Sequence, residues 1–442
     1  MTKISNKNIW NIAYPIVLGN LAQTLIIITD TAFLGHLNPV ALGASMIAGM
    51  YYFVFSTIAW GFGIGIQIIV ARRLGEGNLK RIGVIFQHGL AFVALLSLLL
   101  FSVQHFFTDY ILSGIISSSN VLESAVEFME WRHYGIFFAC FNFLFRSLYI
   151  GLSNTRSLTY STVLMAVVNI FLDYTLIFGN RFFPEMGISG AALASVFAEF
   201  SATVFFVVYT IIKLPLKEYA LNTIHRFEAW LIKAILRLSL PTMLQKLISF
   251  GTWLIFFVLV EHMGEIPIAV SGVVRSVYMF VNMPIFALGA TANTLTSRLI
   301  GSNEADSVKS LLFKIEKLCF AWILPIVTVC LIIPSSILSI YTNDVDLINA
   351  SIPSLYVVCT ATIAMGFGII YFESVSGTGN TSAALVIETL VLVFYTFGTW
   401  FFASYIGTST ALVWTVEIFY GLGLGVGSLL YLRFADWRKK KI

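Results

Sequence analysis

The chain has 442 residues, of which 58% are hydrophobic and 11% are charged, and its formal net charge is +4. Soluble domains carry about 25% charged residues, so this composition excludes an ordinary soluble protein and predicts that much of the apolar surface faces lipid. The small positive charge gives no reason to expect a nucleic-acid-binding surface.

Twelve apolar segments are long enough to cross a membrane as helices, which takes about 20 residues. Six are expected in the first half, at 9–34, 42–70, 84–106, 127–150, 158–179 and 188–212. Six more are expected in the second half, at 232–260, 266–297, 312–340, 350–376, 382–405 and 409–432. A polar stretch, LPLKEYALNTIHR, separates the halves. We therefore expect an N-lobe at 1–213, a cytoplasmic linker at 214–228 and a C-lobe at 229–442.

Basic residues are distributed unequally between the two sets of loops. The loops on the side of the N-terminus contain basic residues at 72–73, 80–81, 213–237 and 433–441, whereas the opposite loops contain only Arg181. Positive charge in short loops marks the cytoplasmic side. The sequence thus predicts that both termini are cytoplasmic, in a cell membrane of bacterial inner-membrane type.

The two halves repeat each other at a constant offset of 226 residues, for example from Pro15 to Pro241 (241 − 15) and from Gly151 to Gly377 (377 − 151). Six helices per half place the halves in the same orientation, as parallel repeats, with the substrate expected between them. Pro15 and Pro241 each interrupt an apolar run, so each is either a fixed kink or a moving hinge.

Acidic residues inside apolar segments are costly and usually functional. Asp30 in the first helix and Asp173 in the fifth are expected at similar depth, and Asn169 lies four residues before Asp173 on the same helical face. We predict one polar pocket lined by these three residues. Two close carboxylates there could hold a proton, or together with the Asn carbonyl could bind Na⁺. Neighbouring hydroxyl groups bonded to the acids are the structural alternative.

The second half lacks these acids, because the counterparts of Asp30, Asn169 and Asp173 are Phe256, Tyr395 and Thr399. This difference suggests a task that belongs to the first half alone.

Other polar residues in the spans are candidates for a substrate cavity or a gate. They are Gln23, Lys246, Arg275, Glu373 and Glu388. We expect Lys246, Glu373 and Glu388 to cluster in the cytoplasmic half of the membrane. We expect Arg275 to pair with Glu417 in the outer half.

No sequence pattern supports ATP hydrolysis or metal chemistry. The chain has no GxxxxGK[ST], HExxH or GxSxG motif and no CxxC pair, so we expect no enzyme, no cofactor and no metal centre. Its glycine run at 421, 423, 425 and 427 is typical of close helix packing.

Several motifs occur in a fixed order: ITDTAFLGHL, VARRLGEGN, VVNIFLDYTLIFG and GISGAALASVFAE, then TLTSRLIGSNEAD and SGTGNT. With the repeat, this order resembles the multidrug and toxic compound extrusion (MATE) transporters over essentially the whole chain. The resemblance implies a V-shaped cavity between the two lobes. It also implies an N-lobe cation site at Asp30, Asn169 and Asp173, with the hydroxyl of Ser195 nearby, and a bend of the first helix at Pro15.

The chain departs from some branches of that family. The acid which those branches carry in helix seven is Ser249 here, and the acid in helix ten falls near Met365 or Gly366. A C-lobe cation site of that type is therefore not expected, and the coupling ion is left as H⁺ or Na⁺.

The expected function is a cation-coupled antiporter, monomeric, which exports amphipathic and cationic organic compounds by alternating access. A flippase for a lipid-linked precursor is the alternative within the same superfamily, but it would need a more basic cavity than Lys246 and Arg275 provide. A sugar-type facilitator is a weaker alternative, because the loop after the second helix reads ARRLGEGN.

Overall fold

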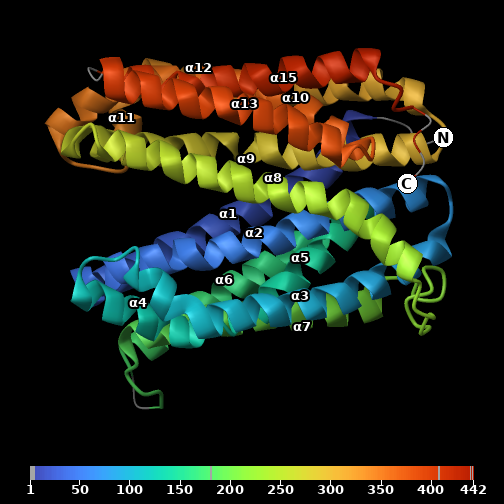
Figure 1. Ribbon diagram of the computed structural model, residues 1–442, viewed down its shortest axis with the longest axis horizontal. Helices are drawn as coiled ribbons and strands as arrows, with labels where there is room; N and C mark the ends of the chain where they lie inside the picture. Colours follow the sequence, from blue (N-terminus) through green and yellow to red (C-terminus); the bar gives the residue numbers. More distant parts are fainter. Residues whose placement is uncertain (1–4, 180–181, 407–408, 439, 441) are drawn as a thin grey trace. The chain divides into compact units, whose positions relative to one another are not determined.

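The computed structural model describes residues 5–179, 182–406, 409–438, 440 and 442, and within these residues it contains helices and no strands (Figure 1). Contacts divide the chain into two compact units. The N-terminal unit comprises Pro15–Leu74 and Asn78–Met243, and the C-terminal unit comprises Met1–Tyr14, Gly75–Gly77 and Leu244–Ile442. These units differ from the expected lobes at 1–14 and 229–243, and the lobe boundaries stay a prediction.

Six helices lie mainly in the N-terminal unit. They are α2 (Pro39–Gly75), α3 (Leu79–Ser113), α4 (Ser119–Arg132), α5 (Gly135–Gly151), α6 (Arg156–Ile177) and α7 (Gly187–Lys213). Within this unit α7 packs against α4, α5 and α6, and α3 packs against α5. Both α1 (Asn6–Leu37) and α8 (Ala229–Glu261) change unit along their length.

The C-terminal unit is built around α12, which packs against α9, α10 and α15. Its helical elements are α9 (Glu265–Gly301), η1 (Ala305–Ser307), α10 (Val308–Ile332), α11 (Pro334–Leu338), α12 (Val345–Gly377), α13 (Thr381–Phe401), the π-helix η2 (Phe402–Ile406), α14 (Thr410–Trp414) and α15 (Val416–Phe434).

In the described part of the chain, eleven spans are long and apolar enough to cross a membrane, and α4 with α5 makes a twelfth. The predicted twelve-helix architecture is confirmed. Three predicted helices are not continuous. The span at 127–150 bends by 57° between α4 and α5. The span at 312–340 ends at Ile332, just before Pro334, and the last span breaks between α14 and α15.

Glycines allow α15 to approach two neighbouring helices closely. A Cβ on Gly421 would collide with the backbone of Ala364 in α12, and one on Gly423 would contact Val391 in α13. The interpretation of the glycine run as packing surface is confirmed.

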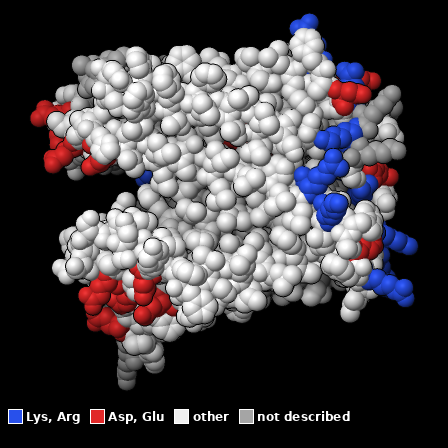
Figure 2. Space-filling model, viewed as in Figure 1, with Lys and Arg blue, Asp and Glu red and all other residues white. Residues whose placement is uncertain are grey.

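Charges gather at opposite ends of α3 in the N-terminal unit. Its first turn carries Lys80 and Arg81, and its last turns carry Asp109. The acidic end continues onto α4, where Glu123 and Glu127 help to line a surface hollow of ≈ 730 Å³. Figure 2 shows acidic side chains gathered at this end of the unit and basic side chains at the other end. Arg181, the single basic residue predicted on this side, lies outside the described residues.

Both helices that change unit do so next to a proline. In α1 the boundary lies between Tyr14 and Pro15, and in α8 it follows Met243, two residues after Pro241. The carbonyl oxygen of Pro15 accepts a hydrogen bond from Thr159 Oγ1 of α6, at 2.8 Å. The second segment of α1 is thereby fixed to the N-terminal unit at the proline itself.

Candidate cation site

The two acids predicted to share a pocket lie together in the N-terminal unit. Asp173 and Asn169 lie one helical turn apart on α6, and neither has solvent-exposed surface. Asp30, from α1, is half-buried, and its carboxyl group lies within hydrogen-bonding range of that of Asp173. Two segments distant in the sequence thus bring their carboxyl groups into contact inside an apolar protein.

Most polar atoms of this group have no hydrogen-bond partner among the described residues. They are Asp30 Oδ1, both carboxylate oxygens of Asp173, and Oδ1 and Nδ2 of Asn169. Leaving one buried polar group unpaired costs about 1–3 kcal/mol, and a charged group costs more. One proton on either acid would let it donate to the other. A small hard cation would instead fit the oxygen ligands that the three side chains supply.

For Asp173 the structural alternative is not seen, because no hydroxyl group in the described residues donates to its carboxylate. Ser195 is half-buried on α7, which packs along α6. In the described contacts its hydroxyl group makes no hydrogen bond to Asp30, Asn169 or Asp173. Its predicted place in the site stays a prediction.

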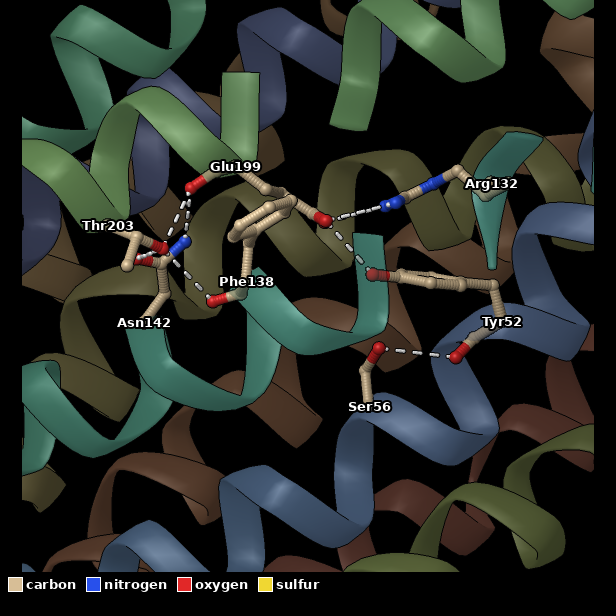
Figure 3. Close-up of polar contacts among 7 residues, drawn as sticks. All are labelled: Tyr52, Ser56, Arg132, Phe138, Asn142, Glu199 and Thr203. Atoms are coloured by element: carbon tan, nitrogen blue, oxygen red, sulfur yellow. Dashed lines mark hydrogen bonds and ion pairs between the residues drawn. The ribbon is translucent and has the colours of Figure 1, made fainter. Parts of the chain in front are cut away.

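A half-buried ion pair lies near the acids. Arg132 donates two hydrogen bonds to Glu199, at 2.6 and 3.0 Å, and Tyr52 donates a third, at 3.0 Å (Figure 3). The Arg132 guanidinium also stacks 3.5 Å from the centre of the Tyr52 ring. Arg132 is close enough to Asp30 for their charges to interact. The network therefore places a compensated positive charge beside the acidic pair.

The backbone of Glu199 is held by the next layer of this network. Asn142 donates to the Glu199 carbonyl oxygen at 2.9 Å, and Thr203 donates to Asn142 Oδ1 at 2.9 Å (Figure 3). Arg132 ends α4, Asn142 lies on α5, and Glu199 lies on α7, so these bonds join the bent α4–α5 span to its neighbour. No sequence periodicity links these residues, and only their burial in apolar segments pointed to them.

The matching positions of the C-terminal unit form an apolar and aromatic contact. Phe256 and Tyr395 are 1% and 5% exposed, and their ring centroids lie 6.0 Å apart. The hydroxyl of Thr399 donates to the backbone oxygen of Tyr395, at 2.8 Å. The repeat is therefore stable without acids at these positions.

Of the three second-half residues expected to cluster, the structure brings two together. Lys246 is close enough to Glu388 for their charges to interact. Glu373 instead accepts a hydrogen bond from Asn293 of α9, at 3.0 Å. Gln23 is exposed on α1. Roles for these four residues in a cavity or gate stay predictions.

The predicted pairing of Arg275 with Glu417 is wrong. Glu417 accepts hydrogen bonds from Tyr278 at 2.7 Å and from Tyr395 at 2.8 Å. Arg275 lies over the rings of Trp253 and Phe257, at 5.6 and 5.3 Å. Tyrosine hydroxyl groups satisfy the buried acid, so it needs no ionic partner. The sequence offered one signal, since Tyr395 is the repeat counterpart of Asn169.

Comparison with known proteins identifies relatives along nearly the whole chain. The family model described as MatE matches twice, at residues 15–175 and 241–401. A protein of Synechocystis sp. named probable multidrug resistance protein NorM is 25% identical and covers 98% of this chain and 93% of its own. A relative of the same name in Thermotoga maritima is 25% identical, with 86% and 82% covered. A FAD transporter of Shewanella oneidensis is 22% identical, with 87% and 84% covered.

Solved structures share the fold at lower identity. One is an outward-facing multidrug resistance MATE family transporter of the MOP superfamily, with a TM-score of 0.88, 20% identity and coverage of 98% and 97% of the two chains. Another is a MOP superfamily transporter from Pyrococcus furiosus, with a TM-score of 0.86, 20% identity and coverage of 99% and 97%.

Proposed function

Since the chain belongs to the MatE family of multidrug and toxic compound extrusion transporters, we propose that it is an antiporter which exports amphipathic, cationic organic compounds in exchange for H⁺ or Na⁺. The protein is a multi-pass membrane transporter and not an enzyme. Access to the substrate alternates between the two sides of the membrane, and the coupling ion is the sole cofactor.

The observation that carries the proposal is the contact between Asp30 and Asp173. Two like charges about 4 Å apart repel by roughly 4 kcal/mol at an effective dielectric constant of 20. Binding one proton or one Na⁺ removes that repulsion and supplies the partner that their oxygens and Asn169 lack. Losing the ion restores the repulsion. The pair therefore responds to the ion with a free-energy change large enough to bias a conformational equilibrium.

The asymmetry of the repeat supports a coupling role. Acids that served only the fold would be expected in both units, but Phe256 and Thr399 occupy the matching positions in the C-terminal unit and are well packed there. Carboxyl groups at these two repeat positions therefore occur in one unit only. The cost of burying them is characteristic of residues kept for function.

The names of the two NorM relatives, multidrug resistance proteins, support export of drugs. The buried acids Asp173, Glu388 and Glu417 support a cationic substrate, because they give the spans a negative character. The FAD transporter among the relatives favours a second candidate, export of an anionic flavin nucleotide, with Lys246 and Arg275 as the basic groups.

We propose a bacterial inner-membrane location, a monomeric protein and cytoplasmic termini. The basic beginning of α3 and the linker at 214–228 would lie in the cytoplasm, and the acidic hollow at α4 would lie outside.

The test is efflux of a fluorescent organic cation from cells that lack their main efflux pumps. Asp30→Asn and Asp173→Asn are compared with wild type and with Asp109→Asn, a control in an exposed acid. We expect both site variants to lose efflux at normal membrane levels while the control keeps it. Collapsing the H⁺ and Na⁺ gradients separately then identifies the ion.

Normal efflux by both site variants would remove the coupling role from these acids. If wild type moves no dye but exports FAD, the flavin nucleotide candidate replaces the cationic substrate.

A further inference from the structure

A second buried carboxyl group with unpaired surroundings lies in the C-terminal unit. Glu388, on α13, is 4% exposed. Its Oε1 accepts hydrogen bonds from Ser249 Oγ of α8, at 2.6 Å, and from the hydroxyl of Tyr420 of α15, at 2.8 Å. Three helices therefore converge on one oxygen of this carboxyl group.

The other oxygen has no such support. Glu388 Oε2 is buried and has no hydrogen-bond partner among the described residues. Gln245 is 3% exposed, and its side chain lies against the same carboxyl group. Its Oε1 also lacks a donor within the described part of the chain. Glu388 Oε2 is thus buried with no donor at hydrogen-bonding distance among the residues that the structure describes, and a proton on this oxygen would remove the cost of leaving a charged oxygen unpaired there.

The hydroxyl group of Ser249 also has partners that suit both the ionised and the protonated form of Glu388. Ser249 Oγ lies 2.6 Å from Glu388 Oε1 and 2.7 Å from the backbone oxygen of Gln245, but it has one hydrogen to donate. When Glu388 is ionised, Ser249 donates to it. When Glu388 is protonated on Oε2, Oε1 keeps its hydrogen bond from Tyr420, and Ser249 can donate to the backbone oxygen of Gln245 instead. Both protonation states are therefore accommodated without movement of the helices.

Glu417, which is 4% exposed, is a buried carboxyl group of the same unit with different hydrogen bonding. Each of its oxygens accepts a hydrogen bond from a tyrosine, Tyr278 or Tyr395, so neither oxygen is left unpaired. The ring of Tyr395 lies 5.8 Å from that of Tyr420, the residue that donates to Glu388. The two acids are thus neighbours in one aromatic layer. Both oxygens of Glu417 are hydrogen-bonded, whereas Oε2 of Glu388 has no partner among the described residues.

The charged and titratable groups around Glu388 are few. Lys246 of α8 and Tyr420 of α15 face it, and Glu417 lies behind Tyr420. In the described residues, α12, α14 and η2 bring no ionisable group to it, since Glu373 of α12 bonds Asn293. The ionised form is balanced by the charge of Lys246.

We propose that Glu388 is a second proton-binding residue, in the C-terminal unit, which takes a proton from water and returns it to water, while Glu417 exchanges no proton. The claim that Glu388 exchanges its proton during transport rests on the proposed function, whereas the claim that it binds a proton does not. Gln245, Ser249 and Tyr420 position the carboxyl group for both of its states.

The test follows the C=O stretching band of protonated carboxyl groups by infrared spectroscopy on purified protein across a pH titration. The background is the double variant Asp30→Asn with Asp173→Asn, which removes the N-terminal pair. We expect an acid band to remain, to disappear in Glu388→Gln and to persist in Glu417→Gln. Ser249→Ala, which keeps the carboxyl group, should shift the midpoint of the titration.

A band that survives Glu388→Gln in folded protein, or one that Glu417→Gln removes instead, would overturn the proposal. A midpoint unchanged by Ser249→Ala would do the same. These readouts do not depend on transport. If Asp30→Asn and Asp173→Asn leave efflux normal, the proposed function fails, but the infrared band of protonated Glu388 is still expected.

Discussion

A single glycine makes room for the charged network beside the acidic pair. Gly135 is the first residue of α5, directly after the bend of the α4–α5 span. A Cβ at this position would collide with the guanidinium of Arg132 and the carboxylate of Glu199, and would press on the Tyr52 hydroxyl. A buried ion pair is stabilising only when its geometry is intact, because each misplaced charge keeps its desolvation cost. The geometry of the ion pair therefore depends on the missing side chain at Gly135.

We expect Gly135→Ala to lower the stability of the protein by about 1–3 kcal/mol, the range typical of overpacking in a filled interior. Thermal unfolding of the detergent-solubilised protein measures it. Gly49→Ala is the matched control, because Gly49 lies in α2 and a Cβ there would meet nothing within 4 Å. The control should be neutral or slightly stabilising, as alanine favours helix. If Gly135→Ala unfolds at the wild-type temperature, the network accommodates the added methyl group without loss of stability.

The sequence predicts some of these residues and not others, for a physical reason. Helical spacing and equal depth were sufficient to bring Asp30, Asn169 and Asp173 together. The partner of a buried charge depends on helix rotation, which spacing within one helix does not determine. Arg275 and Glu417 have opposite charges and were expected at similar depth. Arg275 nevertheless lies over an aromatic ring, and Glu417 is hydrogen-bonded to a tyrosine.

At the scale of elements, the linker is docked onto the beginning of α3. Gly83 donates its amide to the carbonyl oxygen of Tyr219, at 3.0 Å, and a Cβ on Gly83 would strike that carbonyl. The Gln87 side chain donates to the Thr223 carbonyl and accepts from the amide of His225 at 3.0 Å. Composition marks this stretch as a linker, but its docking depends on side chains of α3 that look like ordinary helix surface in the sequence.

The end of the linker is held by charge. Arg81 donates two hydrogen bonds to Glu228, at 2.6 and 2.9 Å, and lies over the ring of Trp230. The amide of Glu228 donates to His88 Nε2 at 2.8 Å, and His88 Nδ1 lies 2.7 Å from the Val84 carbonyl oxygen. His88 therefore has the tautomer with its proton on Nδ1.

We expect Arg81→Gln to release the linker and to speed trypsin cleavage after Lys217 and Arg226. Lys80→Gln is the control, because it removes a neighbouring exposed charge and leaves the Arg81–Glu228 pair intact. Cleavage should occur in inside-out membrane vesicles and not in right-side-out ones, since the linker is proposed to be cytoplasmic. Equal cleavage of Arg81→Gln and wild type would mean that the ion pair does not hold the linker.

The same pair gives the docked linker a pH dependence. Hydrogen bonding to Arg81 holds the pKa of Glu228 below its ordinary value. Docking lowers the pKa of Glu228, so the ion pair stabilises the docked linker fully at any pH above the pKa that Glu228 has in the undocked chain. This stabilisation is lost as the pH falls through the lower pKa that Glu228 has in the docked linker. Hydrogen exchange of the linker amides should therefore stay slow into mildly acid buffer and quicken below it. Arg81→Gln should remove that acid transition, and an unchanged transition would assign it to another group.

At the scale of the whole molecule, the internal repeat accounts for most of what the sequence predicts. The family model matches 15–175 and 241–401, and both ends are offset by 226 residues (241 − 15 and 401 − 175), as the aligned motifs predict. Span number follows from hydropathy alone. Breaks such as that between α4 and α5 do not, because an apolar run of sufficient length is compatible with one straight helix or two bent segments.

The repeat also places one proline at each point where a helix changes unit. Pro15 begins the part of α1 that belongs to the N-terminal unit, and Pro241 lies two residues before α8 leaves it. Proline removes one helical hydrogen bond and weakens the helix locally by about 3 kcal/mol. Each helix that passes from one unit to the other therefore has a weak point close to the boundary, and the repeat provides it twice.

We expect Pro15→Ala to raise the unfolding temperature and to lower the rate of dye efflux, because the restored amide can donate to the carbonyl of Asn11 and stiffens α1 where it must bend. Pro325→Ala is the control, since Pro325 is an exposed proline inside α10, which remains within one unit. It should gain stability and keep its efflux rate. Efflux by Pro15→Ala at the wild-type rate would make Pro15 a fixed kink and would leave Pro241 as the remaining hinge candidate.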